Sequence, residues 1–280
     1  MAAKTIFITG ASSGIGLASA KLFHEKGWNV IATMRTPTPD HELSKYQERM
    51  LIQRLDLQSF DSIKPAIDEG IKKFFTIDVL LNNAGYGQNG LFEAIPRESV
   101  QEQFDVNLFG VMDVTRAILP HFRANGHGGV INVSSGAGFW ALPMSTMYSA
   151  SKFALEGFTE GLSYELASQN IFVKSVVPHG GVTSTKFVDR FRASTATDAT
   201  ISATYKDFTA ATVESFIKMT AAAGISSSDV AEIIFTAATD GTNQLRYFIG
   251  DDARGFLKAR YESKTDEEYM KFMRSYFPKV

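Results

Sequence analysis

The chain has 280 residues, with 28 Lys and Arg against 30 Asp and Glu, and a formal net charge of −2 at pH 7. This near-neutral balance excludes a nucleic-acid-binding protein, which needs a basic surface. Cysteine is absent, which excludes disulfides, cysteine nucleophiles and cysteine-bound metal sites and fits a reducing compartment. No apolar run approaches the roughly 20 residues that a membrane-spanning helix needs. We therefore expect a cytoplasmic protein that binds neither nucleic acid nor membranes.

Short runs rich in β-branched residues alternate with longer segments of helical periodicity along most of the chain. In chain order, the predicted elements are strand Thr5–Thr9, helix Ile15–Lys26, strand Val30–Met34, strand Ile52–Leu55, helix Phe60–Phe74, strand Val79–Asn82, helix Ser99–Leu119, strand Val130–Val133, helix Tyr148–Ser168, strand Phe172–Val177, helix Ser228–Ala238 and strand Tyr247–Ile249. Because right-handed connections between parallel strands carry helices, this order predicts an α/β fold: a parallel sheet covered by helices on both faces. No linker or repeat divides the chain, so we expect one domain over residues 1–280.

Two segments do not follow the alternation. Thr183–Ser227 is too long for a simple connection, since loops above about 12–15 residues usually serve as lids or are disordered. Its aromatic residues favour a partly helical substrate lid over a surface insertion; they are Phe187, Phe191, Tyr205, Phe208 and Phe216. The tail Phe256–Val280 has apolar residues at helical spacing, which predicts an extension that packs on the body or on a partner subunit.

A glycine-rich turn joins the first predicted strand to the first predicted helix. Gly10, Gly14 and Gly16 stand in the spacing Gly-x3-Gly-x-Gly. Glycines let the backbone approach a pyrophosphate, and the start of a helix presents unpaired N–H groups and a positive dipole to it. A tight strand-to-helix turn without a ligand would also contain glycines, so the turn alone does not decide its function.

Further motifs follow at the ends of later strands. Asn82-Asn83-Ala84-Gly85 ends the fourth strand, Asn107 lies in the next helix, Ser134-Ser135 closes the fifth strand, and Tyr148 and Lys152 stand four residues apart in the helix after it. Residues four apart on a helix share a face, so the Lys152 ammonium would lower the pKa of the Tyr148 phenol from its free value of about 10. A phenol with such a pKa suits general acid–base catalysis.

In this order, the motifs over residues 4–250 resemble those of the short-chain dehydrogenase/reductase family. The resemblance implies a single-domain, Rossmann-type, doubly wound parallel sheet. It also implies an oxidoreductase that transfers hydride between a nicotinamide cofactor and a ketone or secondary alcohol, without a metal. The alternative is a non-catalytic NADP-binding sensor, which would have no reason to keep the residues of the reaction together.

The resemblance implies four catalytic residues. Tyr148 would exchange a proton with the substrate oxygen as general acid or base, and Ser135 would hydrogen-bond that oxygen. Lys152 would bind the nicotinamide ribose and lower the pKa of Tyr148, and Asn107 would position Lys152 and a proton-relay water. Ser135 precedes Tyr148 by 13 residues, the family's usual separation, and Ser134 is the alternative.

The end of the second strand predicts which cofactor is bound. NAD-selective enzymes place a carboxylate there, whereas Met34 and Arg35 stand at this point of the chain, and a guanidinium can bond a 2′-phosphate. We therefore predict NADP(H) rather than NAD(H). The family's pattern after the sixth strand is changed here, so either Thr183 or Thr185 would contact the pyrophosphate or amide. The expected cofactor contacts are Gly10, Ser12, Ser13, Gly14, Ile15, Gly16, Arg35, Asp56, Leu57, Asn83, Ala84, Gly85, Tyr148, Lys152, Pro178, Val182, Thr183 and Thr185.

The expected substrate pocket is lined mainly by apolar and aromatic residues, which favours a bulky apolar ketone or alcohol. Its predicted residues are Tyr86, Gly136, Phe139, Trp140, Met144 and His179. His179 stands where relatives usually have glycine, and it either tunes specificity or fills space. The 5 histidines lack metal-ligand spacing, so we expect no metal site. By the same resemblance, helices carrying Asn107 and Tyr148 form a homodimer or homotetramer contact.

Overall fold

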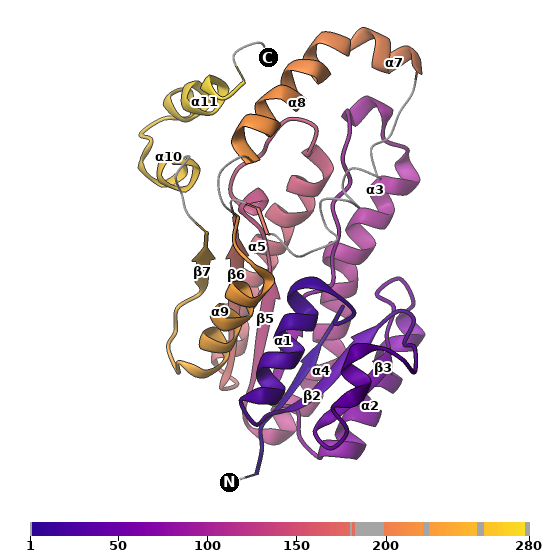
Figure 1. Ribbon diagram of the computed structural model, residues 1–280. Helices are drawn as coiled ribbons and strands as arrows, with labels where there is room; N and C mark the ends of the chain where they lie inside the picture. Colours follow the sequence, from indigo (N-terminus) through magenta and orange to yellow (C-terminus); the bar gives the residue numbers. More distant parts are fainter. Residues whose placement is uncertain (1, 180, 183–198, 221–223, 251–254, 278–280) are drawn as a thin grey trace.

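The computed structural model describes residues 2–179, 181–182, 199–220, 224–250 and 255–277 (Figure 1). Its centre is a seven-stranded sheet of order β3-β2-β1-β4-β5-β6-β7 in which neighbouring strands are parallel. The strands are β1 (Thr5–Ile8), β2 (Asn29–Met34), β3 (Met50–Arg54), β4 (Val79–Asn82), β5 (Gly128–Val133), β6 (Ile171–Pro178) and β7 (Arg246–Ile249). The strand order reverses between β1 and β4, which confirms the predicted doubly wound sheet and places a ligand crevice at their carboxyl ends.

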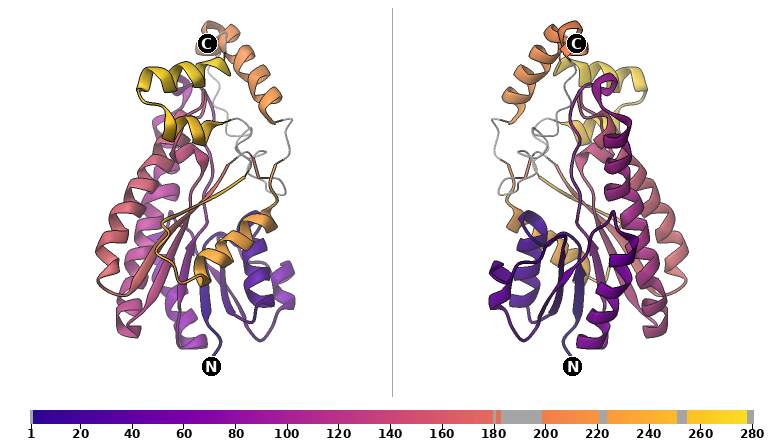
Figure 2. Two further views of the ribbon diagram at one scale, coloured as in Figure 1. Left: turned by 90° about the vertical axis from the view of Figure 1, so that its left-hand side faces the viewer. Right: turned by 90° about the vertical axis from the view of Figure 1, so that its right-hand side faces the viewer.

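Helices cover both faces of the sheet, as Figure 2 shows. On one face lie α1 (Gly14–Glu25) and α9 (Ser227–Thr239), over a core that includes Phe23 and Ile234. On the other lie α2 (Ile63–Phe74), α4 (Gly110–Asn125) and α5 (Thr146–Ala167), over a core that includes Phe122. The short helical turns are η1 (Glu42–Lys45), η2 (Phe60–Ser62), η3 (Phe92–Ala94) and η5 (Gly136–Gly138).

The predicted helix over residues 99–119 proved longer and less regular. It comprises α3 (Arg97–Phe104), the π-helical turn η4 (Asp105–Phe109) and α4. Pro120 lies inside α4 without ending it, because Ile118 and Phe122 on either side are buried in the core. The helix ends where Gly126 adopts a left-handed conformation, with φ of 71°.

Most other boundaries differ from the prediction by one or two residues. The strand β5 begins at Gly128 rather than Val130, although glycine is a weak strand former. The rings of Phe122 and Phe172 occupy the space that side chains at Gly128 and Gly129 would need. These glycines therefore lie in the strand because their neighbours fill the sheet surface above them.

Four more helices lie near the end of the chain. Between β6 and β7 are α7 (Ala199–Thr204) and α8 (Lys206–Thr220), and after β7 come α10 (Phe256–Glu262) and α11 (Asp266–Ser275). We call α8, α10 and α11 the helical cap, which lies beyond the carboxyl ends of the strands (Figure 1). The cap packs through an aromatic cluster that includes Trp140, Phe256 and Phe277. The tail thus packs on the body, one of the two predicted outcomes. Within the described residues, no helix is long and apolar enough to cross a membrane.

Candidate active site

A cavity of about 760 Å³ lies at the carboxyl ends of the central strands, between the sheet and the helical cap. It brings together residues that stand far apart in the sequence. The predicted site residues that line it are Gly10, Ser12, Ser13, Gly14, Ile15, Arg35, Asp56, Leu57, Asn83, Ala84, Gly85, Tyr86, Ser135, Gly136, Trp140, Tyr148, Lys152, Pro178, His179 and Val182. Candidate cofactor and substrate residues therefore share one space.

Some predicted residues lie outside this lining. Gly16 is buried behind the glycine turn, and Asn107 is buried beneath the loop after β4. The Phe139 ring packs against Phe248, with 5.0 Å between ring centroids, and so belongs to the aromatic cluster. Met144 adopts a positive φ of 59° and is also absent from the cavity wall. Thr183 and Thr185 lie outside the described residues.

The glycine turn has the shape and the free donors that a pyrophosphate requires. A Cβ at Gly16 would lie 2.4 Å from Asn83 Nδ2 and from the Gly10 carbonyl oxygen, so only glycine fits there. Asn83 Nδ2 donates to the carbonyl oxygens of Thr9 at 2.9 Å and Gly10 at 3.1 Å, which holds the turn. The Ser13 side chain makes no capping hydrogen bond to α1. The first N–H groups of α1 are thus not capped by that side chain and lie at the cavity.

Tyr148 and Ser135 meet at the end of β5. Tyr148 is 9% exposed, and its side chain is hydrogen-bonded to that of Ser135. Burial raises the pKa of Tyr148 to about 12, while the hydrogen bond with Ser135 lowers it. Burial therefore dominates the pKa of Tyr148 in this structure, and Ser135 rather than Lys152 is the residue that lowers it. Ser134 also lines the cavity; a Cβ at Gly138 would lie 3.2 Å from its Oγ, which has no hydrogen-bond partner among the described residues.

Lys152 is buried one helical turn after Tyr148. Its Nζ donates to the Val133 carbonyl oxygen at 3.0 Å, and its side chain lines the cavity. Burial lowers the pKa of the Lys152 amine to about 8, and the charge of Glu156 raises it. A Cβ at Gly85 would lie 3.8 Å from Lys152 Nζ, so the loop after β4 packs against the amine.

Asn107 ties that loop to α5. Its Oδ1 accepts from the Tyr86 N–H at 3.1 Å, and its Nδ2 donates to the Tyr86 carbonyl oxygen at 2.8 Å and to Ser151 Oγ at 3.2 Å. Ser151 Oγ in turn donates to the Tyr148 carbonyl oxygen at 2.7 Å. The described hydrogen bonds of the Asn107 amide thus go to the loop and to α5, while its role in positioning Lys152 and a proton-relay water stays a prediction.

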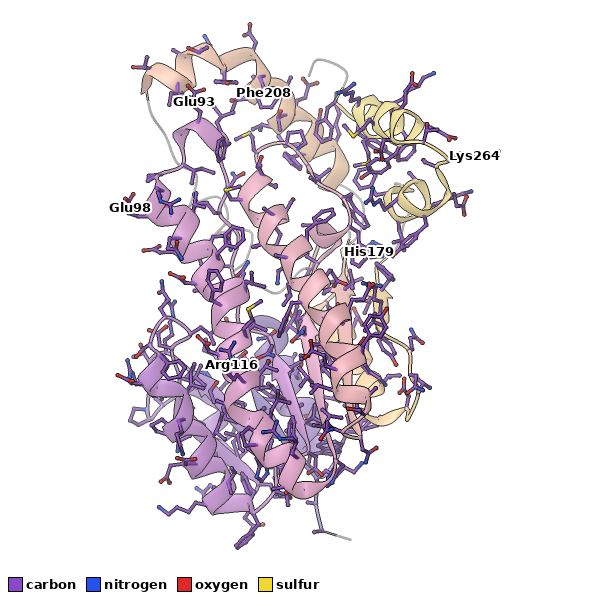
Figure 3. The ribbon with its side chains drawn as sticks, turned by 180° about the vertical axis from the view of Figure 1, so that it is seen from behind. Glu93, Glu98, Arg116, His179, Phe208 and Lys264 are labelled. Atoms are coloured by element: carbon purple, nitrogen blue, oxygen red, sulfur yellow. The ribbon has the colours of Figure 1, made fainter. Side chains whose placement is uncertain are left out.

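The substrate end of the cavity is aromatic. His179 is 7% exposed, and its ring lies edge-on to Trp140, with 5.8 Å between ring centroids. In Figure 3 His179 lies at the end of the sheet, on the side of α10 and α11. The wall also includes Leu142, between the predicted wall residues Gly136 and Met144, and Phe216 of the predicted lid. Ser145 and, from the cap, Phe256 line it as well, and the sequence did not place these two there. Helical spacing predicted that the tail packs on the body, but no sequence signal pointed Phe256 at the cavity.

The opposite end carries two arginines. Arg35 follows β2, and Arg54 ends β3 opposite Met34 in the sheet register. Both line a smaller adjoining cavity with Asp56, and both side chains are exposed. Neither forms an ion pair with a described residue. Arg54 was missed because its place beside Arg35 depends on strand pairing.

A doubly wound sheet with a glycine turn, and a tyrosine and a lysine one helical turn apart beside it, defines an oxidoreductase of the Rossmann type. The family model described as short chain dehydrogenase matches residues 4–196, and the chain belongs to that family. It is 35% identical over 234 residues to an uncharacterised oxidoreductase of Schizosaccharomyces pombe. The match covers 84% of this chain and 94% of the relative.

Two further similarities extend over most of the chain. A 3-ketodihydrosphingosine reductase of Bacteroides thetaiotaomicron is 39% identical over 189 residues, 68% of this chain and 67% of the relative. Among solved structures, a short-chain dehydrogenase from Streptomyces avermitilis has a TM-score of 0.80 at 30% identity, over 98% of this chain and 99% of that one.

Proposed function

We propose that the protein is an NADP(H)-dependent carbonyl reductase or alcohol dehydrogenase for bulky apolar ketones or secondary alcohols. The observation that carries this proposal is the meeting of Tyr148, Ser135 and Lys152 beside the glycine turn in one cavity. A cavity of this size and apolar lining suits a small organic substrate next to a dinucleotide.

The residues fit a dinucleotide along the length of the cavity. The N–H groups at the start of α1 would bind the pyrophosphate, and Lys152 would bind the nicotinamide ribose. Asp56 would contact the adenine side, and Arg35 with Arg54 would bind the 2′-phosphate. When bound, the cofactor supplies or accepts the hydride at its nicotinamide ring.

The side chains of the site handle the proton. Tyr148, with its pKa raised by burial, is present as the phenol at neutral pH and can donate its proton to a carbonyl oxygen in reduction. Ser135 Oγ, hydrogen-bonded to Tyr148, would hold the same oxygen in place. In oxidation, Tyr148 would act as the phenolate, which the ammonium of Lys152 would stabilise, and it would take the hydroxyl proton and become the phenol.

The apolar wall supports the substrate class. Trp140, Leu142, Phe216 and Phe256 would bury the body of a ketone without a charged partner. One relative is named as a reductase of a keto compound, 3-ketodihydrosphingosine. His179 would contact the substrate and tune specificity. The segment Thr183–Ser227, whose described part includes α7 and α8, would serve as the lid of a single-domain enzyme.

We also propose a homodimer or homotetramer formed through α4 and α5. Phe109 and Phe153 are 47% and 40% exposed, although both are large and apolar. A Cβ at Gly157 or Gly161 would meet no other atom within 4 Å, so another helix can approach closely there. The lack of cysteine fits a site of action in the cytoplasm.

The test is oxidation of NADPH and NADH against a panel of aromatic and aliphatic ketones, with the wild type beside Tyr148→Phe. We expect turnover with NADPH that falls about 10²–10⁴-fold in the variant, because the proton donor is lost. NADPH affinity should be largely retained, since the glycine turn, Lys152 and the arginines supply most of the proposed dinucleotide contacts. Tight NADPH binding without turnover would favour the sensor, and a preference for NADH would overturn the role given to Arg35.

A further inference from the structure

The helix α5 continues beyond the active site with two carboxylates at the same spacing. Tyr148, Lys152, Glu156 and Glu160 follow one another at intervals of four residues, so successive members stack along one face. Glu156 is only 5% exposed, and buried carboxylates are rare unless they are paired. The proposed reaction uses the first two members of this series and leaves the burial of Glu156 unexplained.

Glu156 is held by two adjacent strands. Ser175 Oγ donates to Glu156 Oε1 at 2.5 Å, and Arg246 Nε donates to Glu156 Oε2 at 2.8 Å. Ser175 of β6 and Arg246 of β7 are direct partners in the sheet. One row of paired residues across the strands, here called a rung, therefore supplies both contacts. Arg246 Nη2 also reaches Glu160 Oε2 at 2.5 Å. The charges therefore alternate in sign from Lys152 through Glu156 and Arg246 to Glu160.

The same rung continues in polar residues beneath α5. Asn132 of β5 is the sheet partner of Ser175 and also of Asn82 on β4. Asn132 Nδ2 donates to Thr159 Oγ1 of α5 at 2.9 Å, and Asn82 Nδ2 donates to Asn132 Oδ1 at 2.9 Å. Directional bonds thus fix both the rotation and the axial position of α5 on the sheet.

Few charged groups face Lys152. In the described residues the charged group is Glu156 of α5, one turn after; Tyr148, one turn before, is a neutral phenol, and β5 contributes the Val133 carbonyl oxygen. A Cβ at Gly138 would lie 3.0 Å from both Glu156 Cγ and the Lys152 carbonyl oxygen, so η5 closes tightly over this turn. The charged groups that face Glu156 are Lys152 and Arg246. Glu156 therefore places a buried negative charge one helical turn from the amine, without a direct ion pair among the described residues, and this charge raises the pKa of Lys152.

We propose that Glu156 is a positioning residue of the reaction: anchored by Ser175 and Arg246, its carboxylate keeps Lys152 an ammonium at the place where the nicotinamide ribose binds. A buried cation is less stable when a nearby negative charge is lost, because the hydrogen-bond partner of Lys152 is the neutral Val133 carbonyl oxygen. The proposal rests on the proposed function, since it requires Lys152 to bind that ribose. It does not rest on the 2′-phosphate, because NADP and NAD share the nicotinamide ribose.

The test is Glu156→Gln, which keeps an oxygen acceptor for Arg246 and removes the charge. The dissociation constant of NADPH, or of NADH if that binds more tightly, is measured by quenching of tryptophan emission from about pH 6 to 9, together with kcat/KM. Lys152 is charged below its pKa, and loss of Glu156 lowers that pKa. We expect unchanged affinity near pH 6, about fivefold weaker binding near pH 8 and about tenfold near pH 9, because the alkaline limb moves down by about one pH unit.

Glu160→Gln is the matched control, since it makes the same change on the same helix and touches the same arginine. Its side chain is 44% exposed, so solvent screens its charge from Lys152, and its pH profile should coincide with that of the wild type. If Glu156→Gln does not fold, as judged by circular dichroism, the double variant with Arg246→Gln removes both charges of the pair and should show the same shift.

Three results would overturn the proposal: no alkaline limb in the wild type, no shift in a folded variant that lacks Glu156, or an equal shift in Glu160→Gln. A wild type that binds neither NADPH nor NADH would contradict the proposed function as well. A wild type that binds and turns over, with an unshifted Glu156→Gln profile, would contradict the role of Glu156 alone.

Discussion

The two sides of the cavity are held by different kinds of contact. On the sheet side, Lys152, Glu156 and Asn132 make directional bonds to neighbouring strands and helices. On the cap side, aromatic edges meet, with centroid distances of 5.9 Å for Trp140–Phe256 and for Phe216–Phe277. Directional bonds fix the atoms that react, whereas apolar contacts define the shape of what can bind. The family match, over residues 4–196, covers β1 to β6 and α5 and ends before α7 and β7.

The largest expected contrast comes from Phe122→Ala and Phe256→Ala, which remove a fully buried ring from each side. Phe122 lies in the sheet core, so its loss should lower the free energy of unfolding by about 3–5 kcal/mol. Phe256→Ala should lower it less, because the aromatic cluster is separate from the two sheet cores. It should instead raise the KM of an apolar ketone about tenfold, since Phe256 lines the cavity.

Urea denaturation and steady-state kinetics on both variants check this contrast. NADPH affinity should be unchanged in Phe256→Ala, because the ring lies at the substrate end. If Phe256→Ala weakened NADPH and ketone binding equally, the cap would contribute to cofactor binding as well as to substrate binding.

A smaller effect is expected at the arginine pair. Arg35→Gln and Arg54→Gln should each weaken NADPH binding about tenfold, since a charge-assisted hydrogen bond to phosphate is lost. NADH binding should not change, because NADH has no 2′-phosphate. Arg116→Gln is the control: Arg116 is exposed on α4 (Figure 3) and pairs with Asp113 at 2.8 Å. Equal losses of NADPH and NADH affinity would show that these two arginines do not bind the 2′-phosphate.

The smallest effect is expected where the lid meets the loop after β4. Tyr205 donates from its hydroxyl to Glu93 Oε2 at 3.1 Å, and Figure 3 shows Glu93 in the same region as Phe208. This contact is exposed, so Tyr205→Phe should change the KM of the ketone less than about threefold. Tyr205→Ala, which also removes the ring contact with Phe208, should change it more. If Tyr205→Phe changed the KM as much as Tyr205→Ala, the hydrogen bond to Glu93 rather than the ring contact would hold the lid against this loop.

The sheet side was the more predictable, for a physical reason. Its strands are β-branched runs, and the motif residues stand at their carboxyl ends, where parallel strands meet. Boundaries failed where neighbours override local propensity, as at Gly128 in β5 and Pro120 in α4. The sequence-based substrate wall failed at Met144, because its positive φ belongs to a loop conformation that periodicity does not reveal.

Long-range pairing accounts for most of what was missed. Phe256 was not predicted at the cavity, which it lines together with Phe216 of the predicted lid although 40 residues separate them. Arg54 reaches Arg35 through strand register, and Glu156 meets Arg246 because β6 and β7 are neighbours. These contacts depend on tertiary structure, so a pattern read along one segment does not contain them.

Every cap helix follows β6 or β7 in the chain, and these are the last two strands at one edge of the sheet. A single recombination crossover after Pro178 would therefore exchange the whole cap between homologues and leave the residues of the reaction in place. Such a chimera would also exchange β7, and with it Arg246. The buried Glu156 would then keep its ion pair only if the incoming sequence has an arginine at the position of Arg246, beside Ser175 in the sheet.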